Sequence, residues 1–227
     1  MSIELTYFGH SAFKIVYGSN TILIDPFLSQ NPAFKGKVED LKPNDILVTH
    51  GHSDHLGDSI PISKKTGAII TTMFELANYC EARGAVVNPV GMGSKINFDW
   101  GFATFLPASH SSSTPDGSYA GCATSILIQI EDLKIYHAGD TGLHYDLKMI
   151  GELHKPDIAI LPIGGHFTMG IDEAVQAVKW LNCKNVIPMH YDTFPPIRTN
   201  VADFKVKTEV DTDSKCIILR SGESVRF

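Results

Sequence analysis

Three histidines and one aspartate fall within six consecutive positions of this chain, directly after a short apolar segment. Gly51 lies among them and Gly57 follows them, and both permit a tight loop. Imidazole and carboxylate groups together are typical of Zn²⁺, Mn²⁺ or Fe sites, whereas cysteines alone would indicate a closed structural zinc. Four ligands so close in sequence cannot easily converge on one ion, so two ions that share the loop are the easier geometry. A surface loop that is rich in histidine by chance is the less expected alternative. The segment is Thr49-His50-Gly51-His52-Ser53-Asp54-His55-Leu56-Gly57.

Length and composition limit the kinds of protein that can carry such a loop. The chain has 227 residues, of which 43% are hydrophobic and 19% charged, which is ordinary for a globular protein with a sizeable core. No linker or short-period repeat is visible, so we predict a single domain over 1–227. The net charge of −6 gives no general attraction to nucleic acid.

The cysteines and the apolar segments bear on the compartment. Cys80, Cys122, Cys183 and Cys216 are scattered and form no C-x-x-C pair, so free thiols are expected rather than a disulfide framework. The N-terminus resembles no signal peptide, and no apolar run approaches the ~20 residues of a membrane span. We therefore expect a cytoplasmic protein without membrane contact.

Hydrophobic patterning predicts an α/β protein. Short β-branched and aromatic runs predict strands early in the chain, and strands alternate with helices later, the clearest helix being an amphipathic segment with Asp172 and Glu173 in its first turn. Two sheets with helices outside them would accommodate this pattern. Predicted strands cover 3–8, 12–17, 21–24, 45–49, 68–71, 102–106, 123–130, 133–138, 158–161, 186–189 and 216–219, and predicted helices 73–83, 145–153 and 171–181.

The histidine-rich loop resembles the signature of the metallo-β-lactamase superfamily. The rest of that pattern follows in order, each part after a predicted strand: His110 in Pro107-Ala108-Ser109-His110, Asp140 in Gly139-Asp140-Thr141-Gly142, and His190 in Pro188-Met189-His190-Tyr191. Three further segments resemble a compact bacterial group of metal-dependent hydrolases related to the ascorbate-6-phosphate lactonases. They are Tyr7-Phe8-Gly9-His10-Ser11-Ala12-Phe13, Gly164-Gly165-His166-Phe167-Thr168-Met169 and His190-Tyr191-Asp192-Thr193-Phe194-Pro195.

The resemblance implies a fold and a ligand set. The fold is a four-layer αββα sandwich. His50, His52 and His110 would hold one metal ion, Asp54, His55 and His190 the other, and Asp140 would bridge the two. The ions would be Zn²⁺ first, with Mn²⁺ or Fe as alternatives. The implied reaction is hydrolysis of a small ester, lactone, thioester or phosphoester by a metal-bridging hydroxide.

Five residues in or near this ligand set are interpreted as follows. Asp54 could also orient the nucleophile or accept its proton. Asp25 ends an apolar strand, and a buried carboxylate there could orient a metal-bound histidine. Thr49 could serve similarly through its hydroxyl, but we interpret it as a plain strand residue. His10 is read as a substrate or structural histidine. His166, in a glycine loop after a strand, is expected to contact substrate as a catalytic group.

Two other functions stay open at this point. A nucleic-acid phosphodiesterase of the tRNA-processing type shares the metal motif, but the acidic balance disfavours it. A metal-holding protein that binds a ligand without turnover is disfavoured because three histidines per site leave an open coordination position. We therefore expect a small-molecule substrate, no nucleic acid and no membrane partner, and leave a homo-oligomer open.

Overall fold

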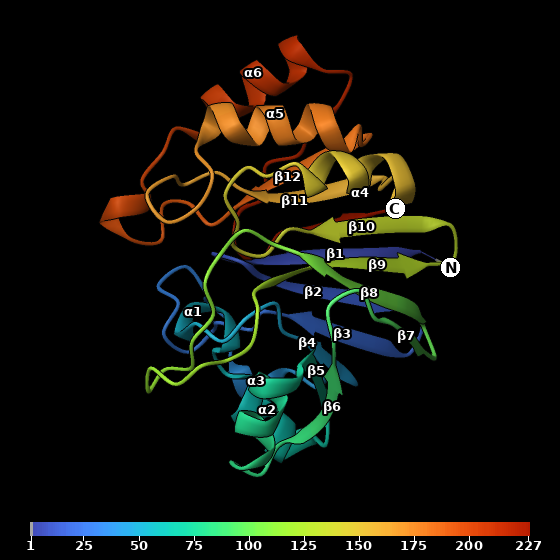
Figure 1. The fold of residues 1–227 in the computed structure, drawn as a ribbon, viewed down its shortest axis with the longest axis vertical. Coiled ribbons are helices and arrows are strands. Elements are labelled where there is room, and N and C mark those ends of the chain that lie inside the picture. Colours follow the sequence, from blue (N-terminus) through green and yellow to red (C-terminus); the bar gives the residue numbers. More distant parts are fainter. Residues whose placement is uncertain (1) are drawn as a thin grey trace. The chain divides into compact units, whose positions relative to one another are not determined.

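The computed structural model of the chain describes residues 2–227, and its contacts divide it into two compact units. Unit 1 comprises Met1–Met92, Ser111–Ala123 and Leu219–Phe227, and unit 2 comprises Gly93–His110 and Thr124–Ile218. The backbone therefore passes between the units four times. Each unit contains one seven-stranded mixed sheet and its own helices (Figure 1). Two sheets with helices agree with the predicted α/β class, and the assignment of 1–227 to one domain stays a prediction.

The sheet of unit 1 has the order β14-β1-β2-β3-β4-β5-β6. Its first four strands pair antiparallel and β3 to β6 pair in parallel. The strands are β14 (Ser224–Arg226), β1 (Ile3–Gly9), β2 (Ala12–Tyr17), β3 (Asn20–Ile24), β4 (Asp45–Leu47), β5 (Ile69–Met73) and β6 (Val86–Val90). The helices are η1 (Val38–Asp40), α1 (Ser53–Leu56), α2 (Ser59–Thr66) and α3 (Phe74–Glu81).

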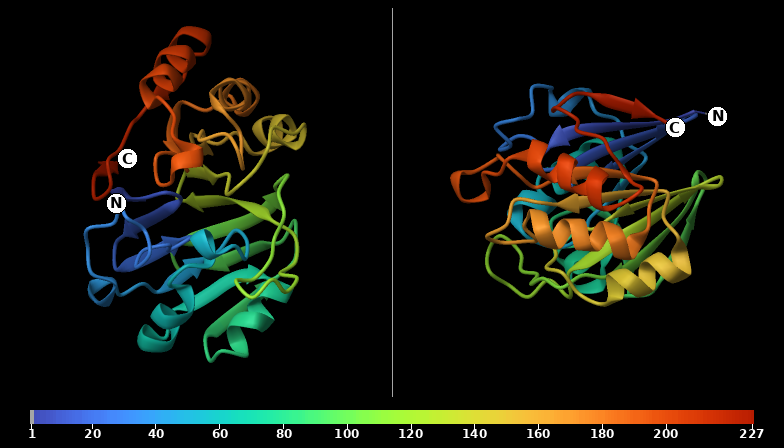
Figure 2. Two further views of the ribbon diagram at one scale, coloured as in Figure 1. Left: turned by 90° about the vertical axis from the view of Figure 1, so that its left-hand side faces the viewer. Right: turned by 90° about the horizontal axis from the view of Figure 1, so that it is seen from above.

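The sheet of unit 2 has the order β13-β12-β11-β10-β9-β8-β7. Strands β7 to β10 pair antiparallel and β10 to β13 pair in parallel, so the sheet repeats the pattern of unit 1 when it is followed from β7. Helix α5 contacts both α4 and α6 (Figures 1 and 2). The strands are β7 (Lys95–Phe98), β8 (Gly101–Pro107), β9 (Thr124–Ile130), β10 (Leu133–His137), β11 (Ile158–Pro162), β12 (Asn185–Met189) and β13 (Lys215–Cys216). The helices are α4 (Asp146–His154), α5 (Ile171–Leu181), η2 (Pro195–Ile197) and α6 (Val201–Asp211).

The strand directions decide where the chemically interesting residues lie. In unit 1, β1, β3 and β4 run the same way, so their carboxyl ends meet one edge of the sheet, where His10, Asp25 and His50 follow them. In unit 2, β8, β10, β11 and β12 share a direction in the same manner. The residues at their carboxyl ends are His110, Asp140, His166 and His190.

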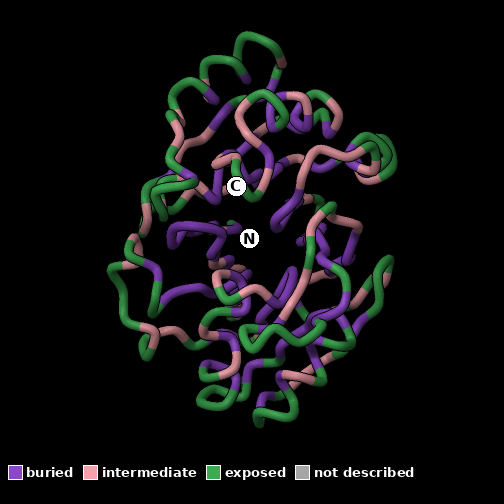
Figure 3. Tube along the Cα trace, turned by 60° about the vertical axis from the view of Figure 1, so that its left-hand side comes forward, coloured by how far each residue is buried: buried purple, intermediate pink, exposed green. Residues whose placement is uncertain are grey.

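Burial of the strands and helices follows the apolar pattern of the sequence. All five residues of β11 are buried, and so are all but one in β9, as expected for strands covered on both faces. Helix α5 buries Ala174, Val175 and Leu181 on one face and ends at Asn182 in a left-handed conformation. In Figure 3 the central strands are mainly buried and the outer turns of the helices exposed.

Several elements differ from the sequence prediction. Strands β6, β7 and β14 and helices α1, α2 and α6 were not predicted. Three of the unpredicted elements, β6, β7 and β14, are edge strands. Strands β7 and β14 alternate polar and apolar residues but have only four and three residues, and β6 shows no alternation and contains Pro89. Helix α6 has only Phe204 and Thr208 buried, so its sequence shows little helical periodicity. No helix among residues 2–227 is long and apolar enough to cross a membrane.

Candidate metal centre

In unit 1 the histidine-rich loop brings its predicted ligands together. His50 and His55 are buried, and Asp54 and His52 are partly exposed. The ring centroids of His50 and His55 are 4.2 Å apart, and Nε2 of His50 lies 3.0 Å from Nδ1 of His52. Helix α1 begins after His52, so Asp54 and His55 project from its first turn. The loop thus presents imidazole nitrogens and a carboxylate within a few ångströms of one another.

Asp25 orients two of these imidazoles. Its carboxylate is fully buried and accepts hydrogen bonds from the backbone N–H of Thr49 at 2.8 Å and from its hydroxyl at 2.7 Å. Nδ1 of His55 lies 2.7 Å from Asp25 Oδ2, and Nδ1 of His50 lies 3.0 Å from Thr49 Oγ1. Because the carboxylate only accepts, His55 donates through Nδ1, and because the Thr49 hydroxyl donates to Asp25, His50 donates to its oxygen. Both rings then keep the lone pair of Nε2 for a metal ion.

His10 lies against Asp54. Its Nε2 is 3.0 Å from Asp54 Oδ2, its side chain is fully buried, and its ring meets those of Phe27 and His55 edge to face. The ligand atoms of His10, Asp54 and His55 all lie within 4.8 Å of one another. The hydroxyl of Tyr7 donates to the His10 carbonyl at 3.0 Å. Within unit 1, His10 therefore belongs to the cluster itself.

In unit 2 the three predicted ligands also converge. Asp140 Oδ2 lies 3.1 Å from Nε2 of His190 and 3.6 Å from Nε2 of His110. The loops that carry His110 and Asp140 are joined by a pair of backbone and side-chain bonds: Ser109 N–H donates to Thr141 Oγ1, and Gly142 N–H to the Ser109 carbonyl, each at 3.0 Å. Asp140 and His190 are buried. One carboxylate oxygen thus faces two imidazoles, as a bridging or shared ligand would.

His166 is exposed but its loop is fixed beside these ligands. A Cβ on Gly164 would lie 2.3 Å from the His190 carbonyl oxygen, so only glycine allows this approach. The backbone N–H of Met169 donates to the Thr141 carbonyl at 3.0 Å, which ties the other end of the loop to the segment after Asp140. His166 itself contacts Phe167 edge to face. Within unit 2 the loop therefore spans the neighbourhoods of both Asp140 and His190.

Left-handed backbone marks several of these strand ends. His10, Asp25, His166 and His190 have φ between 44° and 58°, a region that side chains other than glycine adopt at some cost. Such strained residues cluster at functional sites. Their common position after a strand supports a functional interpretation of His10 and His166.

Three residues were missed or undervalued in the sequence. Thr49, interpreted as a plain strand residue, links Asp25 to His50. Thr141 positions the loop of His110, and the hydroxyl of Ser112 accepts from Gly51 N–H at 3.2 Å and donates to the Ala120 carbonyl. Serine and threonine are common in loops, so only their position beside a ligand motif could have singled them out.

The donor set fits divalent transition-metal ions. Neutral imidazole nitrogen and carboxylate oxygen are the ligands that Zn²⁺, Mn²⁺ and Fe accept. The hydrogen bond of Nδ1 directs Nε2 of both His50 and His55 away from Asp25. A nitrogen separation of 3.0 Å is close to that of two ligands on one tetrahedral zinc, roughly 3.3 Å for Zn–N bonds of about 2.0 Å. Both units therefore carry half-sets of suitable ligands.

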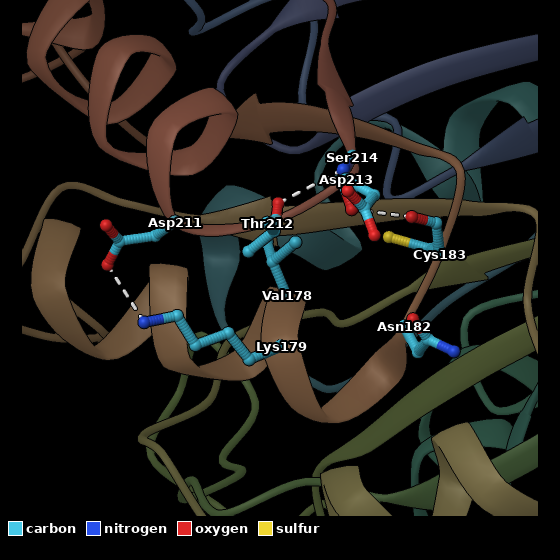
Figure 4. A pocket seen from close by; sticks show the side chains of 8 residues that line it. All are labelled: Val178, Lys179, Asn182, Cys183, Asp211, Thr212, Asp213 and Ser214. Carbon is cyan, nitrogen blue, oxygen red and sulfur yellow. Dashed lines mark hydrogen bonds and ion pairs between the residues drawn. The ribbon is translucent and has the colours of Figure 1, made fainter.

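Several cavities lie within the units. A cavity of about 240 Å³ in unit 1 adjoins the histidine-rich loop through Ser53 and contains none of the predicted ligands. A second, of about 190 Å³, lies between the carboxyl ends of α5 and α6 in unit 2, where Lys179 and Asp211 form an ion pair at 2.8 Å (Figure 4). The first is lined by Phe27, Ser29, Gln30, Ser53, Gly57, Asp58 and Pro115, and the second by Val178, Lys179, Asn182, Cys183, Asp211, Thr212, Asp213 and Ser214.

Comparison with known proteins gives a consistent result. A family model described as "Beta-lactamase superfamily domain" matches residues 4–190. A "UPF0173 metal-dependent hydrolase" of Bacillus cereus is 43% identical over 228 residues, which cover 98% of this chain and 99% of that protein. Igni18, described as a novel metallo hydrolase from Ignicoccus hospitalis, is 38% identical with a TM-score of 0.92, covering 100% of this chain and 99% of that one.

The predicted fold class is confirmed by the same comparison. The metallo-β-lactamase fold protein YhfI from Bacillus subtilis superposes with a TM-score of 0.79 over 100% of both chains, at 14% identity. At that identity the likeness concerns the fold alone. The two sheets and their helices thus have the architecture that the histidine motifs implied.

Proposed function

This chain belongs to the β-lactamase superfamily and, within it, to the UPF0173 metal-dependent hydrolases, and on that premise we propose that it uses two divalent metal ions to hydrolyse a small ester, lactone, thioester or phosphoester. The observation that carries the proposal is the placement of every predicted ligand in one of two clusters. One lies at the carboxyl edge of the unit 1 sheet around His50, and the other at the carboxyl edge of the unit 2 sheet around Asp140.

The proposed assignment of ligands follows the family pattern. His50, His52 and His110 would hold one ion, Asp54, His55 and His190 the second, and Asp140 would bridge them. When bound, two such ions would lower the pKa of a water molecule towards neutrality and would place positive charge beside the developing oxyanion. Zn²⁺ is the ion we expect first, because imidazole dominates the ligand set.

The side chains around the ligands have separate tasks in this proposal. His10 donates from Nε2 to Asp54 Oδ2, which fixes the orientation of that carboxylate and leaves its other oxygen to orient the attacking water and receive its proton. Asp25 holds His50 and His55 in the tautomer that a metal requires. His166, exposed beside the unit 2 ligands, would donate a proton to the leaving group or polarise the bond that breaks.

The unit 1 cavity supports a small substrate. Its volume of about 240 Å³ lies below the range of roughly 300–1,000 Å³ for pockets that hold drug-sized ligands. Phe27 gives it an apolar wall that also contacts His10, while Ser29, Gln30 and Ser53 offer polar groups. We propose that the non-reacting part of the substrate occupies this cavity. Free cysteines throughout the chain are consistent with the proposed cytoplasmic location.

Metal analysis followed by a substrate panel tests the proposal. Protein stripped of metal and reloaded with Zn²⁺ or Mn²⁺ should contain two ions per chain, and Asp140→Ala should lose at least one. Asp213→Ala, an exposed aspartate outside the ligand set, is the matched control and should retain both. A stoichiometry of one or less after saturation would contradict the binuclear assignment.

The panel then identifies the bond that is cleaved. Reloaded protein is assayed with an aryl ester, a lactone, a thioester, an aryl phosphodiester and a structured RNA, with the metal-stripped protein as the blank. Metal-dependent turnover of a small substrate supports the proposal. Turnover of RNA alone would favour the nucleic-acid phosphodiesterase, and metal binding without turnover of any substrate would favour a ligand-binding protein.

A further inference from the structure

Helix α4 carries a row of exposed apolar side chains that the proposed hydrolytic site does not use. Tyr145, immediately before the helix, Met149 and Leu153 are 78%, 45% and 69% exposed. They are spaced four residues apart and so lie along one face, which we call the α4 stripe. The opposite face, with Leu147 and Ile150, is buried against unit 2. A contiguous apolar row in water is typical of an interaction surface.

The stripe is held in place by its own unit. The ring of Tyr145 stacks on that of Trp180 in α5 with centroids 5.3 Å apart and an interplanar angle of 22°. The Tyr145 ring is thus supported on one side while most of its surface remains exposed. Because the stripe is anchored by α4 and by this stacking, little side-chain freedom would be lost when another surface covers it.

The charges beside the stripe indicate that the surface which covers it is a second copy of the same chain. Lys148 and Glu152 are exposed, have opposite signs, and lie one turn apart on the same flank of the stripe. A two-fold axis perpendicular to α4 and close to its middle would place two copies of the helix antiparallel. Lys148 would then face the partner's Glu152, and Glu152 the partner's Lys148. We propose that the α4 stripe is the centre of a two-fold symmetric homodimer interface.

A lipid surface fits the same residues less well. A membrane-binding helix carries several lysines or arginines beside its apolar face, to meet anionic headgroups. Around the α4 stripe, the lysines Lys148 and Lys155 alternate along the chain with the acidic residues Asp146 and Glu152. Alternating positive and negative charges are complementary to the same charges on a second copy of the chain, but not to a uniformly anionic membrane surface. Since α4 has nine residues and is about 13 Å long, the stripe forms the centre of the interface and polar residues around it the rim.

Sedimentation velocity at increasing protein concentration tests the proposal. The wild-type chain should sediment as a dimer, and Met149→Glu, which sets like charges against each other near the axis, should raise the dimer Kd at least about tenfold. The control is Val210→Glu, an equally polar change on α6 at a residue 78% exposed, which should leave the mass unchanged. Far-UV circular dichroism verifies that each variant is folded.

Three further variants test the pairing of charges and the position of the two-fold axis. Lys148→Glu should weaken the dimer, and adding Glu152→Lys should restore it, because the reversed pair is again complementary. Met149→Cys in a Cys122→Ser background should give a disulfide-linked dimer on oxidation, since the other three cysteines are buried. A monomeric wild type, a Met149→Glu variant with unchanged dimer mass, or an oligomer that Met149→Cys does not cross-link would overturn the proposal.

Discussion

Asp25 is a buried acceptor shared by several groups in unit 1. It receives the hydroxyl and N–H of Thr49 and Nδ1 of His55, and through Thr49 it also orients His50. Removing it with Asp25→Ala should weaken metal affinity about 10- to 100-fold, the usual loss when a partner of a ligating histidine is removed. Competition with a chromophoric chelator measures the change. Thr49→Val, which removes the hydroxyl between Asp25 and His50 but keeps the bond between Asp25 and His55, should cost less.

The isosteric Asp25→Asn variant distinguishes orientation from packing. Its amide keeps the shape of the carboxylate but has one oxygen acceptor, and its NH₂ group can meet Nδ1 of His55 only as a donor. The ring would then turn its lone pair towards residue 25 and away from the metal. Affinity should therefore fall in Asp25→Asn as well, and wild-type affinity in this variant would show that the carboxylate serves packing alone.

A second prediction at the residue scale concerns His166. It lies outside the ligand clusters but on a loop fixed to the backbone of His190 and to Thr141. His166→Ala should therefore keep its metal content and its thermal stability while turnover falls about 10²- to 10⁴-fold, as for a general acid. Inductively coupled plasma analysis of the same preparation used for kinetics provides the control. Full turnover in a fully metallated His166→Ala variant would contradict the catalytic role and would indicate that His166 is a structural histidine.

The cysteines differ sharply in their environment. All four are free, as the sequence predicted. Burial raises the pKa of the Cys80 and Cys216 thiols to about 12 and that of Cys183 to about 11, whereas Cys122 is exposed. The thiolate is the reactive form, so at pH 8 an aromatic disulfide reagent should modify Cys122 rapidly and the other three only after denaturation. Fewer than four reactive thiols in denaturant without reductant would contradict the free-thiol assignment.

At the scale of elements, the histidine-rich loop is fitted closely to the segment 111–123. A Cβ on Gly51 would lie 2.7 Å from the Cβ of Ala120 and 2.8 Å from the Ser113 carbonyl oxygen, both within unit 1. Gly51→Ala must therefore displace the loop, at about 1–3 kcal/mol for such overpacking. In a chain of this length the melting temperature should fall by roughly 2–12 °C, with weaker metal binding. Gly170→Ala, whose Cβ would meet only the flexible end of Glu173, is the control.

Parts of this arrangement follow from local sequence and other parts do not. Strands with continuous apolar runs, such as β11, and the amphipathic helix α5 were predictable because their burial imposes a period on the sequence. The ligand motifs were recognisable because each follows a strand. Thr49, Thr141 and Ser112 were not, because their roles depend on partners between 8 and 61 residues away. Edge strands β7 and β14 alternate polar and apolar residues over only four and three residues, and β6 shows no alternation, so none of the three was recognised.

At the scale of the whole molecule, both units repeat one design. Each sheet begins with four antiparallel strands and ends with a parallel run, and in each the candidate ligands follow strands that run in the same direction. The chain nevertheless does not form an amino-terminal and a carboxy-terminal half. Residues 111–123 and 219–227 return to unit 1 after the chain has entered unit 2. Neither unit is therefore a continuous segment that could be excised intact.

This connectivity leads to a prediction about stability. Because the backbone passes between the units four times, unfolding of one unit frees the ends of the segments that belong to the other unit. The two units should therefore unfold together, and calorimetry should show a single transition. Metal ions that bind only the native state should shift this transition upwards, by about 2.7 kcal/mol at a free concentration one hundred times Kd. For a chain of this length the shift is roughly 5–11 °C. It should shrink in Asp140→Ala and persist in Asp213→Ala. Two separate transitions, of which metal moves only one, would contradict the prediction of a single domain.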